Sequence, residues 1–470
     1  MKYKVDKSGH CIMPEGIQTI ENYEFASASD ITDIEIPDSV TSIGEYAFAG
    51  CSGLKAIKIP DSVTSIGDRV FEGCVALNSI QVADDNQFYK SVDNCLLSKD
   101  GLSLILGCNA SIIPNSVTSI GDGAFYGCSG LEAIEIPDGV TSIGDGAFRD
   151  CSGLETIEIT DGVTSIGKDA FYGCSGLETI EIPDGVTSIG DRALEGCSGL
   201  EAIKIPDSVT SIGKDAFAGC SCLETIEIPN SVTSICDRAF NCCYSLRAIE
   251  MPAGVTSIGH EAFSDCWDLI TIEIPNSVAS IGYGAFEGCS SLKTIEIPNS
   301  VTSIAECAFA DCDALNSIQV ADDNQFYKSV DNCLLSKDGL SLILGCNASI
   351  IPNSVTSIGN GAFLGCSGLK AIKIPDGVTS IGDQAFRDCS GLETIEIPAG
   401  VTSIGKYAFA GSNLIAITIH EKNPVKAFLL IQNAGFIKEH ITLNVPIGTG
   451  YAYRHTPFFA KFKMIIAKVR

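Results

Sequence analysis

The chain has 470 residues, a hydrophobic fraction of 45% and a formal net charge of −28. This charge argues against nucleic-acid binding, which needs a basic face, and against simple adsorption to anionic lipid. No run of about 18 consecutive apolar residues occurs, so we predict no membrane-spanning helix. The acidity permits a basic partner or a divalent cation, and it also keeps a large apolar array soluble.

A 23-residue repeat starts almost at the first residue. It reads P-x-x-V-T-S-I-G-x-x-A-F-x-x-C-x-x-L-x-x-I-x-I, and residues 114–136 are a complete copy. A period of this length predicts a solenoid of stacked coils, none of which is stable alone. The column cysteines of the repeat, each three residues after Phe or Leu, are Cys51, Cys74, Cys128, Cys151, Cys174, Cys197, Cys220, Cys243, Cys266, Cys289, Cys312, Cys366 and Cys389.

Each coil should contain two short extended segments. Leu131–Ile136 has the spacing of a short strand with one buried face, and Pro137 ends it because proline has no N–H to donate. Val140–Ile143 predicts a second extended segment. Residues 147–148 are then expected on a tight turn or a single helical turn, and Cys151 packs as a small hydrophobe in the next corner.

Two longer coils interrupt the array, at 83–113 and 321–351. Each has 31 residues, and residues 76–121 and 314–359 are identical over 46 positions. Within the first, Cys95–Leu106 predicts a hairpin around an Asp-Gly turn. With 15 standard coils, the array has about 17.

The period stops near residue 412. We therefore predict two domains, a solenoid over 1–412 and a C-terminal cap over 413–470. In the cap we expect a helix at 423–435, with proline in its first turn, and a strand at 441–445. The aromatic-rich segment 451–466 should close the array, because solenoids need capped ends.

The motif C-x-x-L-x-x-I-x-I-P-x-x-V-x-x-I-G-x-x-A-F resembles the BspA-like leucine-rich repeats over residues 12–420 or so. The L-L-S-K-D-G-L-S-L core of the long coils and the ending that starts Asn444-Val445-Pro446 are also similar to elements of that family. The resemblance implies a curved, right-handed leucine-rich-repeat solenoid. Short parallel strands would line its concave face, with a second short strand and helical turns on its convex side.

The same resemblance implies a non-enzymatic protein that binds host or cell-surface proteins in adhesion, on the cell surface or secreted. The alternative is an intracellular scaffold or effector. Met1–Asp6 lacks the apolar run of a secretory signal, and 22 cysteines suit a reducing compartment. The five histidines are scattered and suggest no catalytic triad, and we predict no cofactor and no metal.

The residue between the two inward isoleucines of each coil should point out of the concave face. Glutamate recurs there, with four in consecutive coils from Glu227 to Glu296. Stacked like charges ~5 Å apart repel by about 0.8 kcal/mol in water, which a basic partner or a cation would relieve. The alternative is a solvated face that prevents edge-to-edge aggregation. The candidate binding residues are Glu135, Glu158, Glu181, Glu227, Glu250, Glu273 and Glu296.

Two aromatic residues near the middle of the chain break the consensus. Trp267 and Tyr244 are candidates for an interface hot spot, and ordinary loop aromatics are the other interpretation. The column cysteines favour a buried ladder over disulfides, because their side chains should be parallel. Cys222, Cys236 and Cys242 cluster off the column, where a metal or a disulfide is the alternative, although no zinc-type spacing is present.

Overall fold

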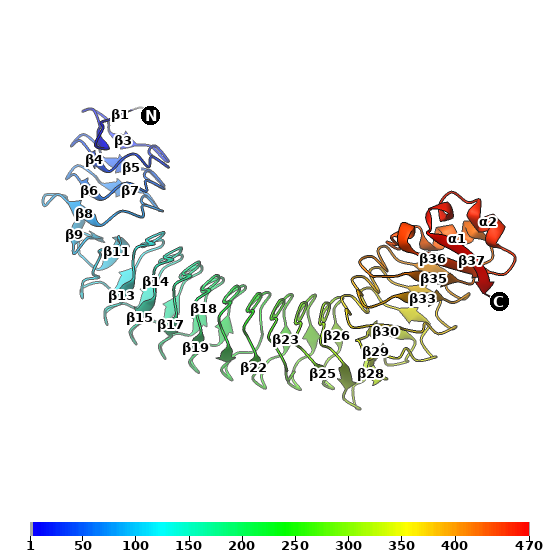
Figure 1. Cartoon of the computed structure of the whole chain (residues 1–470). Coiled ribbons are helices and arrows are strands. Elements are labelled where there is room, and N and C mark those ends of the chain that lie inside the picture. Colours follow the sequence, from blue (N-terminus) through cyan, green and yellow to red (C-terminus); the bar gives the residue numbers. More distant parts are fainter. Residues whose placement is uncertain (1–2, 470) are drawn as a thin grey trace. The chain divides into compact units, whose positions relative to one another are not determined.

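A computed structural model describes residues 3–469. The chain forms two compact units, unit 1 ending at Leu246 and unit 2 starting at Arg247. Each unit is a stack of similar coils (Figure 1), as the 23-residue repeat predicts.

The Leu-x-x-Ile-x-Ile segment of most coils forms a strand, which we call the face strand. Neighbouring face strands pair in parallel, with Ile134 opposite Ile157 one coil later. In unit 1 they are β2 (His10–Ile12), β4 (Asp33–Glu35), β6 (Ala56–Ile59), β8 (Ser79–Val82), β13 (Ala133–Glu135), β15 (Thr156–Glu158), β17 (Thr179–Glu181), β19 (Ala202–Lys204) and β21 (Thr225–Glu227). In unit 2 they are β22 (Ala248–Glu250), β25 (Thr294–Ile297), β27 (Ser317–Val320), β33 (Thr394–Ile397) and β35 (Ala416–Ile419).

The Ser-Ile pair of most coils forms a shorter second strand, also in a parallel ladder, with Ile143 opposite Ile166. In unit 1 the second strands are β3 (Thr19–Ile20), β5 (Ser42–Ile43), β7 (Ser65–Ile66), β12 (Ser119–Ile120), β14 (Ser142–Ile143), β16 (Ser165–Ile166), β18 (Ser188–Ile189) and β20 (Ser211–Ile212). In unit 2 they are β23 (Ser257–Ile258), β24 (Ser280–Ile281), β26 (Ser303–Ile304), β31 (Ser357–Ile358), β32 (Ser380–Ile381) and β34 (Ser403–Ile404).

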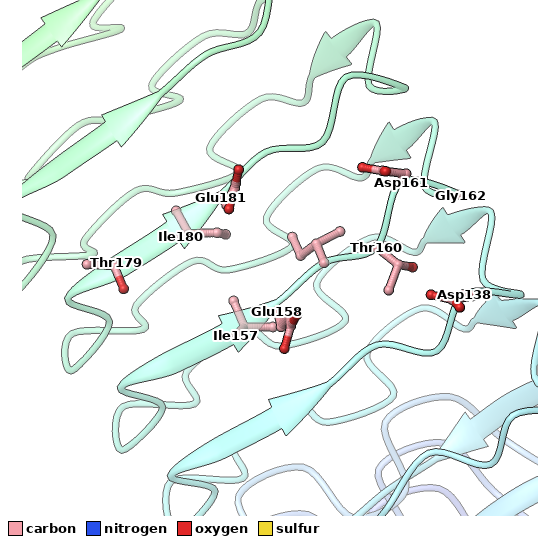
Figure 2. Close-up of a pocket in the computed structure, with 10 residues that line it drawn as sticks. Asp138, Ile157, Glu158, Thr160, Asp161, Gly162, Thr179, Ile180 and Glu181 are labelled. Atoms are coloured by element: carbon pink, nitrogen blue, oxygen red, sulfur yellow. The ribbon is translucent and has the colours of Figure 1, made fainter.

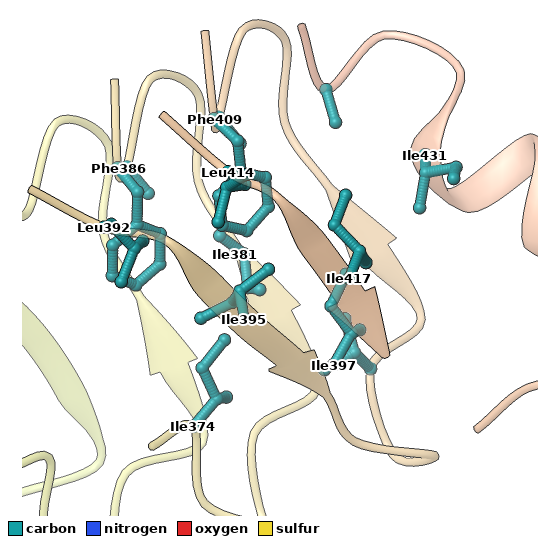
Figure 3. Packing of buried hydrophobic residues seen from close by; sticks show 14 of the residues in the cluster. Ile374, Ile381, Phe386, Leu392, Ile395, Ile397, Phe409, Leu414, Ile417 and Ile431 are labelled. Carbon is teal, nitrogen blue, oxygen red and sulfur yellow. The ribbon is translucent and has the colours of Figure 1, made fainter. Parts of the chain in front are cut away.

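The core is a set of side-chain columns that run through the coils. Phenylalanine rings stack from coil to coil, as for Phe386 and Phe409, whose ring centroids lie 5.3 Å apart at an interplanar angle of 1° (Figure 3). Such aromatic pairs contribute about 0.5–1.5 kcal/mol beyond the area they bury. One coil thus completes its core only by stacking on the next.

The predicted tight turn is present, but it is not helical. In every standard coil the residues five and one positions before the column cysteine have positive φ, as at Arg192 (56°) and Gly196 (76°). Left-handed residues cannot continue a right-handed helix. The turn is instead held by short-range bonds, such as that from the Cys151 N–H to the Phe148 carbonyl at 3.2 Å.

The long coils contain the predicted hairpin and one strand more. β10 (Cys95–Ser98) pairs antiparallel with β11 (Ser103–Leu106), and also with β9 (Tyr89–Val92). β11 then joins the ladder of second strands beside β12. The same meander recurs in unit 2 as β28 (Tyr327–Val330), β29 (Cys333–Ser336) and β30 (Ser341–Leu344).

Each long coil lacks the Ala-Phe-x-x-Cys turn. The turn of the coil before it therefore contacts the turn of the coil after it. Gly107 lies where that turn would start, and a Cβ added there would be 2.1 Å from the Phe125 ring. Across the gap, the Arg69 guanidinium lies 5.2 Å from the centre of the Tyr126 ring. In unit 2 the equivalent bridge is a 2.9 Å hydrogen bond from the Asn360 amide to the Glu306 carboxylate.

Additional strands and helices lie at the two ends of the described chain. β1 (Lys4–Val5) pairs antiparallel with β2. At the other end, β36 (Thr442–Pro446) and β37 (Met464–Val469) extend the face-strand sheet beyond β35. The remaining elements are α1 (Pro424–Ile431), α2 (Gly450–Arg454) and the 3₁₀ helices Lys438–His440 and Phe459–Lys461.

The helix and the strand predicted in the C-terminal segment are confirmed as α1 and β36. Asn423 caps α1, its side-chain oxygen accepting the Val425 N–H at 2.9 Å, and Pro424 occupies the first turn. The domain boundary at 412/413 stays a prediction.

Candidate functional site

The face strands of unit 1 display an acidic surface over three consecutive coils. Alternation buries the isoleucines and exposes the residues between them, because successive side chains of a strand point to opposite faces. Two further exposed positions, one before each strand and one after it, are also acidic there. We call these nine exposed carboxylates the acidic face: Glu132, Glu135, Asp138, Glu155, Glu158, Asp161, Glu178, Glu181 and Asp184.

Register brings these carboxylates into rows. Glu135 lies opposite Glu158, and the next strand, β17, aligns in the same way and carries Glu181. Neighbouring strands lie about 4.8 Å apart. No ion pair among the described residues involves the nine side chains. The row ends at Lys204, which lies opposite Glu181 on one side and Glu227 on the other.

A hollow of about 870 Å³ opens in the middle of the acidic face. Glu158 and Glu181 line one side, on β15 and β17, and Asp138 and Asp161 line the other (Figure 2). Thr160 lies between Asp138 and Asp161 (Figure 2), at a position where the two flanking coils have proline. Four carboxylates around a shallow hollow suit the cationic side chains of a partner.

The predicted row from Glu227 to Glu296 is divided between the units, with Glu227 in unit 1 and Glu250, Glu273 and Glu296 in unit 2. The four-carboxylate stack therefore stays a prediction. Basic residues near Glu250 and Glu296 also reduce the negative charge of the part of this row that lies in unit 2. The segments 247–253, 270–276 and 293–299 hold three Glu and two Lys or Arg, whereas the equivalent segments of the acidic face hold nine acidic residues and no basic one.

In each long coil an apolar residue replaces the outward-pointing glutamate of the face strand. Ile112 and Ile350 take the position of glutamate before the strand-ending proline, and they are 71% and 69% exposed. Val92 and Val330, in the meanders, are also exposed. Both units thus carry the same small apolar area.

The two candidate aromatics lie in the loop that follows the column cysteine, not on a face strand. Trp267 is 49% exposed, and its indole N–H donates to Asp265 at 3.3 Å. Tyr244 is half-buried. A hot-spot role for either stays a prediction.

The turns of unit 1 carry charged and aromatic residues that sequence reasoning did not single out. Arg192 pairs with Asp169 through two contacts of 2.9 Å, and Arg238 pairs with Asp215. Arg149 lies 4.1 Å from the centre of the Tyr172 ring. A search of the repeat for opposite charges 23 residues apart would have found the ion pairs. These ion pairs join neighbouring coils.

All 22 cysteines are free thiols, and 18 of them are buried, including every column cysteine. The predicted buried ladder is therefore confirmed. Of the off-column cluster, Cys222 is exposed and Cys236 and Cys242 are half-buried. Within residues 3–469, no group of three or more His, Cys, Asp or Glu side chains is arranged to hold a metal ion.

The five histidines do not converge on one site. His10 contacts Asp33 at 2.6 Å, His420 contacts Glu396 at 2.6 Å, and His260 accepts the Tyr283 N–H at 2.9 Å. His440 and His455 lie in the C-terminal segment.

The sequence matches the profile of the BspA type leucine-rich repeat region, in six copies, over residues 9–103, 107–224, 210–333 and 345–437. The chain belongs to the BspA-type leucine-rich-repeat family. Repeats of this family form solenoid scaffolds, and the two units of this BspA-type chain have that architecture.

Solved structures of bacterial leucine-rich-repeat proteins resemble this BspA-type chain. A leucine-rich repeat protein from Bacteroides ovatus is 25% identical, with a TM-score of 0.49, covering 93% of this chain and 97% of that one. A leucine-rich cell surface protein from Faecalibacterium prausnitzii is 27% identical, with a TM-score of 0.42 and coverage of 79% and 92%. The comparison with curated proteins returns no match. Over the described residues, no helix is long and apolar enough to cross a bilayer.

Proposed function

We propose that this BspA-type solenoid is a non-enzymatic binding protein that engages a basic surface of a partner protein through the acidic face. One observation carries the proposal. Nine exposed carboxylates stand in register over three coils, and among the described residues none of them forms an ion pair, although Lys204 borders the row opposite Glu181. Mutual repulsion of like charges disfavours the free state, and a partner with Lys or Arg side chains relieves it.

The repeated geometry favours an extended contact over a single deep pocket. Similar outward groups recur every coil, and the hollow beside Glu158 and Glu181 is open and lined by polar groups. Such a surface suits a partner with several basic side chains, bound with salt-sensitive affinity and fast association.

Affinity capture with a matched pair of variants tests the proposal. One variant carries Glu135→Lys, Glu158→Lys and Glu181→Lys, and the other carries Glu250→Lys, Glu273→Lys and Glu296→Lys. Both change the net charge equally, but only the first alters the acidic face. A protein retained by wild type and by the second variant, and lost by the first, supports the proposal. Equal retention by all three chains contradicts it.

Adhesion at the cell surface is the setting that we propose, and an intracellular scaffold is the alternative. The free thiols favour the alternative, because exposed thiols such as that of Cys222 oxidise outside the cell. Protease treatment of intact cells separates the two. Loss of the full-length chain under external protease supports adhesion, and full protection supports the scaffold.

A further inference from the structure

The C-terminal segment has a charge opposite to that of the array. Residues 413–470 hold eight Lys or Arg and two Glu, a net charge of +6, whereas residues 1–412 hold 22 Lys or Arg and 56 Asp or Glu, a net charge of −34. We propose that the C-terminal segment of one copy binds the acidic face of a second copy, head to tail. This inference rests on the proposed function in that it uses the acidic face as a binding surface.

Four exposed cations lie on the last strand or beside it. Lys463 precedes β37 and Lys468 lies within it, while Lys461 ends the 3₁₀ helix just before. Arg454, on α2, donates to the Ile465 carbonyl of β37 at 3.0 Å, which holds it beside the strand. No acidic side chain among the described residues pairs with these four, which we call the basic patch.

Apolar side chains accompany the basic patch. Met464, at the start of β37, is 54% exposed, and Tyr451, on α2, is 74% exposed. β37 is also the last strand of its sheet, and within the described part of the chain its one partner strand is β36. Aromatic and Met side chains beside Arg and Lys are the usual composition of a protein interface.

The two surfaces match in size. Lys463 and Lys468 are five residues apart, about 16 Å along an extended strand. In the acidic face, Glu132 to Asp138 spans at most about 20 Å along one coil, and three coils span about 10 Å across. The basic patch is therefore similar in length to the acidic face, which Lys204 of its own unit borders opposite Glu181.

A second copy is favoured over other polyanions. A net charge of −28 opposes the approach of the chain to any polyanion, a second copy included, so the choice rests on the local match of charge and length between the basic patch and the acidic face. The acidic face of another copy is also present at the same concentration as the basic patch. Because the two surfaces differ, the contact is heterologous, and repetition makes a linear chain of copies.

Sedimentation velocity of the full chain provides the first test. We expect concentration-dependent association at about 50 mM salt, weakened at least tenfold at about 500 mM, where the Debye length falls toward a few ångströms. A chain that stays monomeric at all concentrations and both salt levels overturns the inference.

Charge reversal provides the decisive test. The face variant carries Glu135→Lys, Glu158→Lys and Glu181→Lys, and the cap variant carries Lys461→Glu, Lys463→Glu and Lys468→Glu. Each alone should be monomeric. Mixed together they should form only 1:1 dimers, because one intact acidic face and one intact basic patch remain. A chain with all six changes should associate again. Circular dichroism melting curves check that every variant is folded.

The control variant carries Glu250→Lys, Glu273→Lys and Glu296→Lys, and it should associate like wild type. Failure of the mixture to pair overturns the inference. So does a cap variant that only aggregates, since lysines on an edge strand then serve as protection against edge-to-edge pairing. Binding of wild type to phosphatidylserine vesicles without self-association would assign the patch to anionic surfaces. If self-association fails while the acidic face still captures a partner, the proposed function stands alone.

Discussion

The thiol of Cys151 donates a hydrogen bond of 3.0 Å to the carbonyl of Phe125, which lies 26 residues earlier in the preceding coil. The same bond links Cys174 to Phe148 at 3.1 Å. Burial raises the pKa of the Cys151 thiol well above its ordinary value, so the group keeps the proton that it donates. The cysteine column is therefore a ladder of donors that joins each coil to the one before it.

Thiol accessibility follows from this burial. With Ellman's reagent on the native chain, we expect one fast thiol, Cys222, and three slow ones, Cys236, Cys242 and Cys307. The other 18 are buried and should react only after denaturation. Cys222→Ser should remove the fast phase and nothing else. Rapid reaction of many thiols in the folded chain would show that the column cysteines are accessible to solvent, which would contradict their burial.

Asn86 should be critical for the first long coil. It is fully buried, its amide donates to the Pro60 and Val63 carbonyls at 2.9 Å each, and its oxygen accepts the Phe88 and Tyr89 N–H groups at 2.8 Å each. Asn86→Ala removes all four bonds; the Pro60 carbonyl keeps the Val63 N–H at 3.4 Å, but the other three groups lose this partner, at about 1 kcal/mol or more each.

We therefore expect Asn86→Ala to lower the free energy of unfolding of unit 1 by at least about 3 kcal/mol. Urea denaturation measures this loss, with Asn78→Ala, at an exposed position, as the control. Equal stability of the two variants would contradict the role of Asn86.

The positive φ of the turn makes Gly196 sensitive to substitution. Its φ is 76°, and an added Cβ would meet only ordinary contacts, at 3.5 Å or more from Gly173. Gly196→Ala should thus show the cost of the left-handed conformation alone, about 1–2 kcal/mol. Gly377→Ala, at a position without positive φ and with contacts of 3.6 Å, should be neutral or slightly stabilising. Denaturant midpoints compare the two, and a destabilised Gly377→Ala would point to packing instead.

Unit 2 should gain stability in mild acid through Glu287. Burial, and then the charges of Asp311, Asp265 and Glu261, raise the pKa of the Glu287 carboxyl in the folded chain. The folded state therefore binds this proton more tightly than the unfolded state does. The resulting stability is present below the unfolded pKa of about 4.3 and is lost as the pH rises through the folded pKa.

Glu287→Gln should accordingly stabilise the chain at pH 7, and the gain should shrink toward pH 4. Thermal melting as a function of pH measures this difference. Glu296→Gln, on the exposed side of its face strand, removes the same charge and serves as the control. A gain that is equal for both variants would reflect only the relief of overall repulsion.

The repeat alone predicted much of this fold, because each coil obeys the same local rules. Isoleucines at alternate positions predict the face strands, and the spacing of Phe and Cys predicts the core columns that stacking completes. The Asp-Gly pair at residues 100–101 predicted the hairpin of the first long coil. Asn423 and Pro424 in the same way predicted the start of α1.

Other features depend on contacts between residues far apart in sequence. The non-helical turn follows from residues in the left-handed conformation, such as Arg192. An arginine in the sequence does not predict this conformation. The bridge between Arg69 and Tyr126 exists only because the intervening long coil omits its turn.

By itself, then, the sequence determined the period, the two strands of each coil and the buried columns, since these follow from local spacing and hydrophobicity. Only the tertiary structure decided which glutamates form one surface. Register sets Glu135, Glu158 and Glu181 side by side, and the neighbouring residues in space, acidic around these three and partly basic around Glu250 and Glu296, determine the charge that a partner meets.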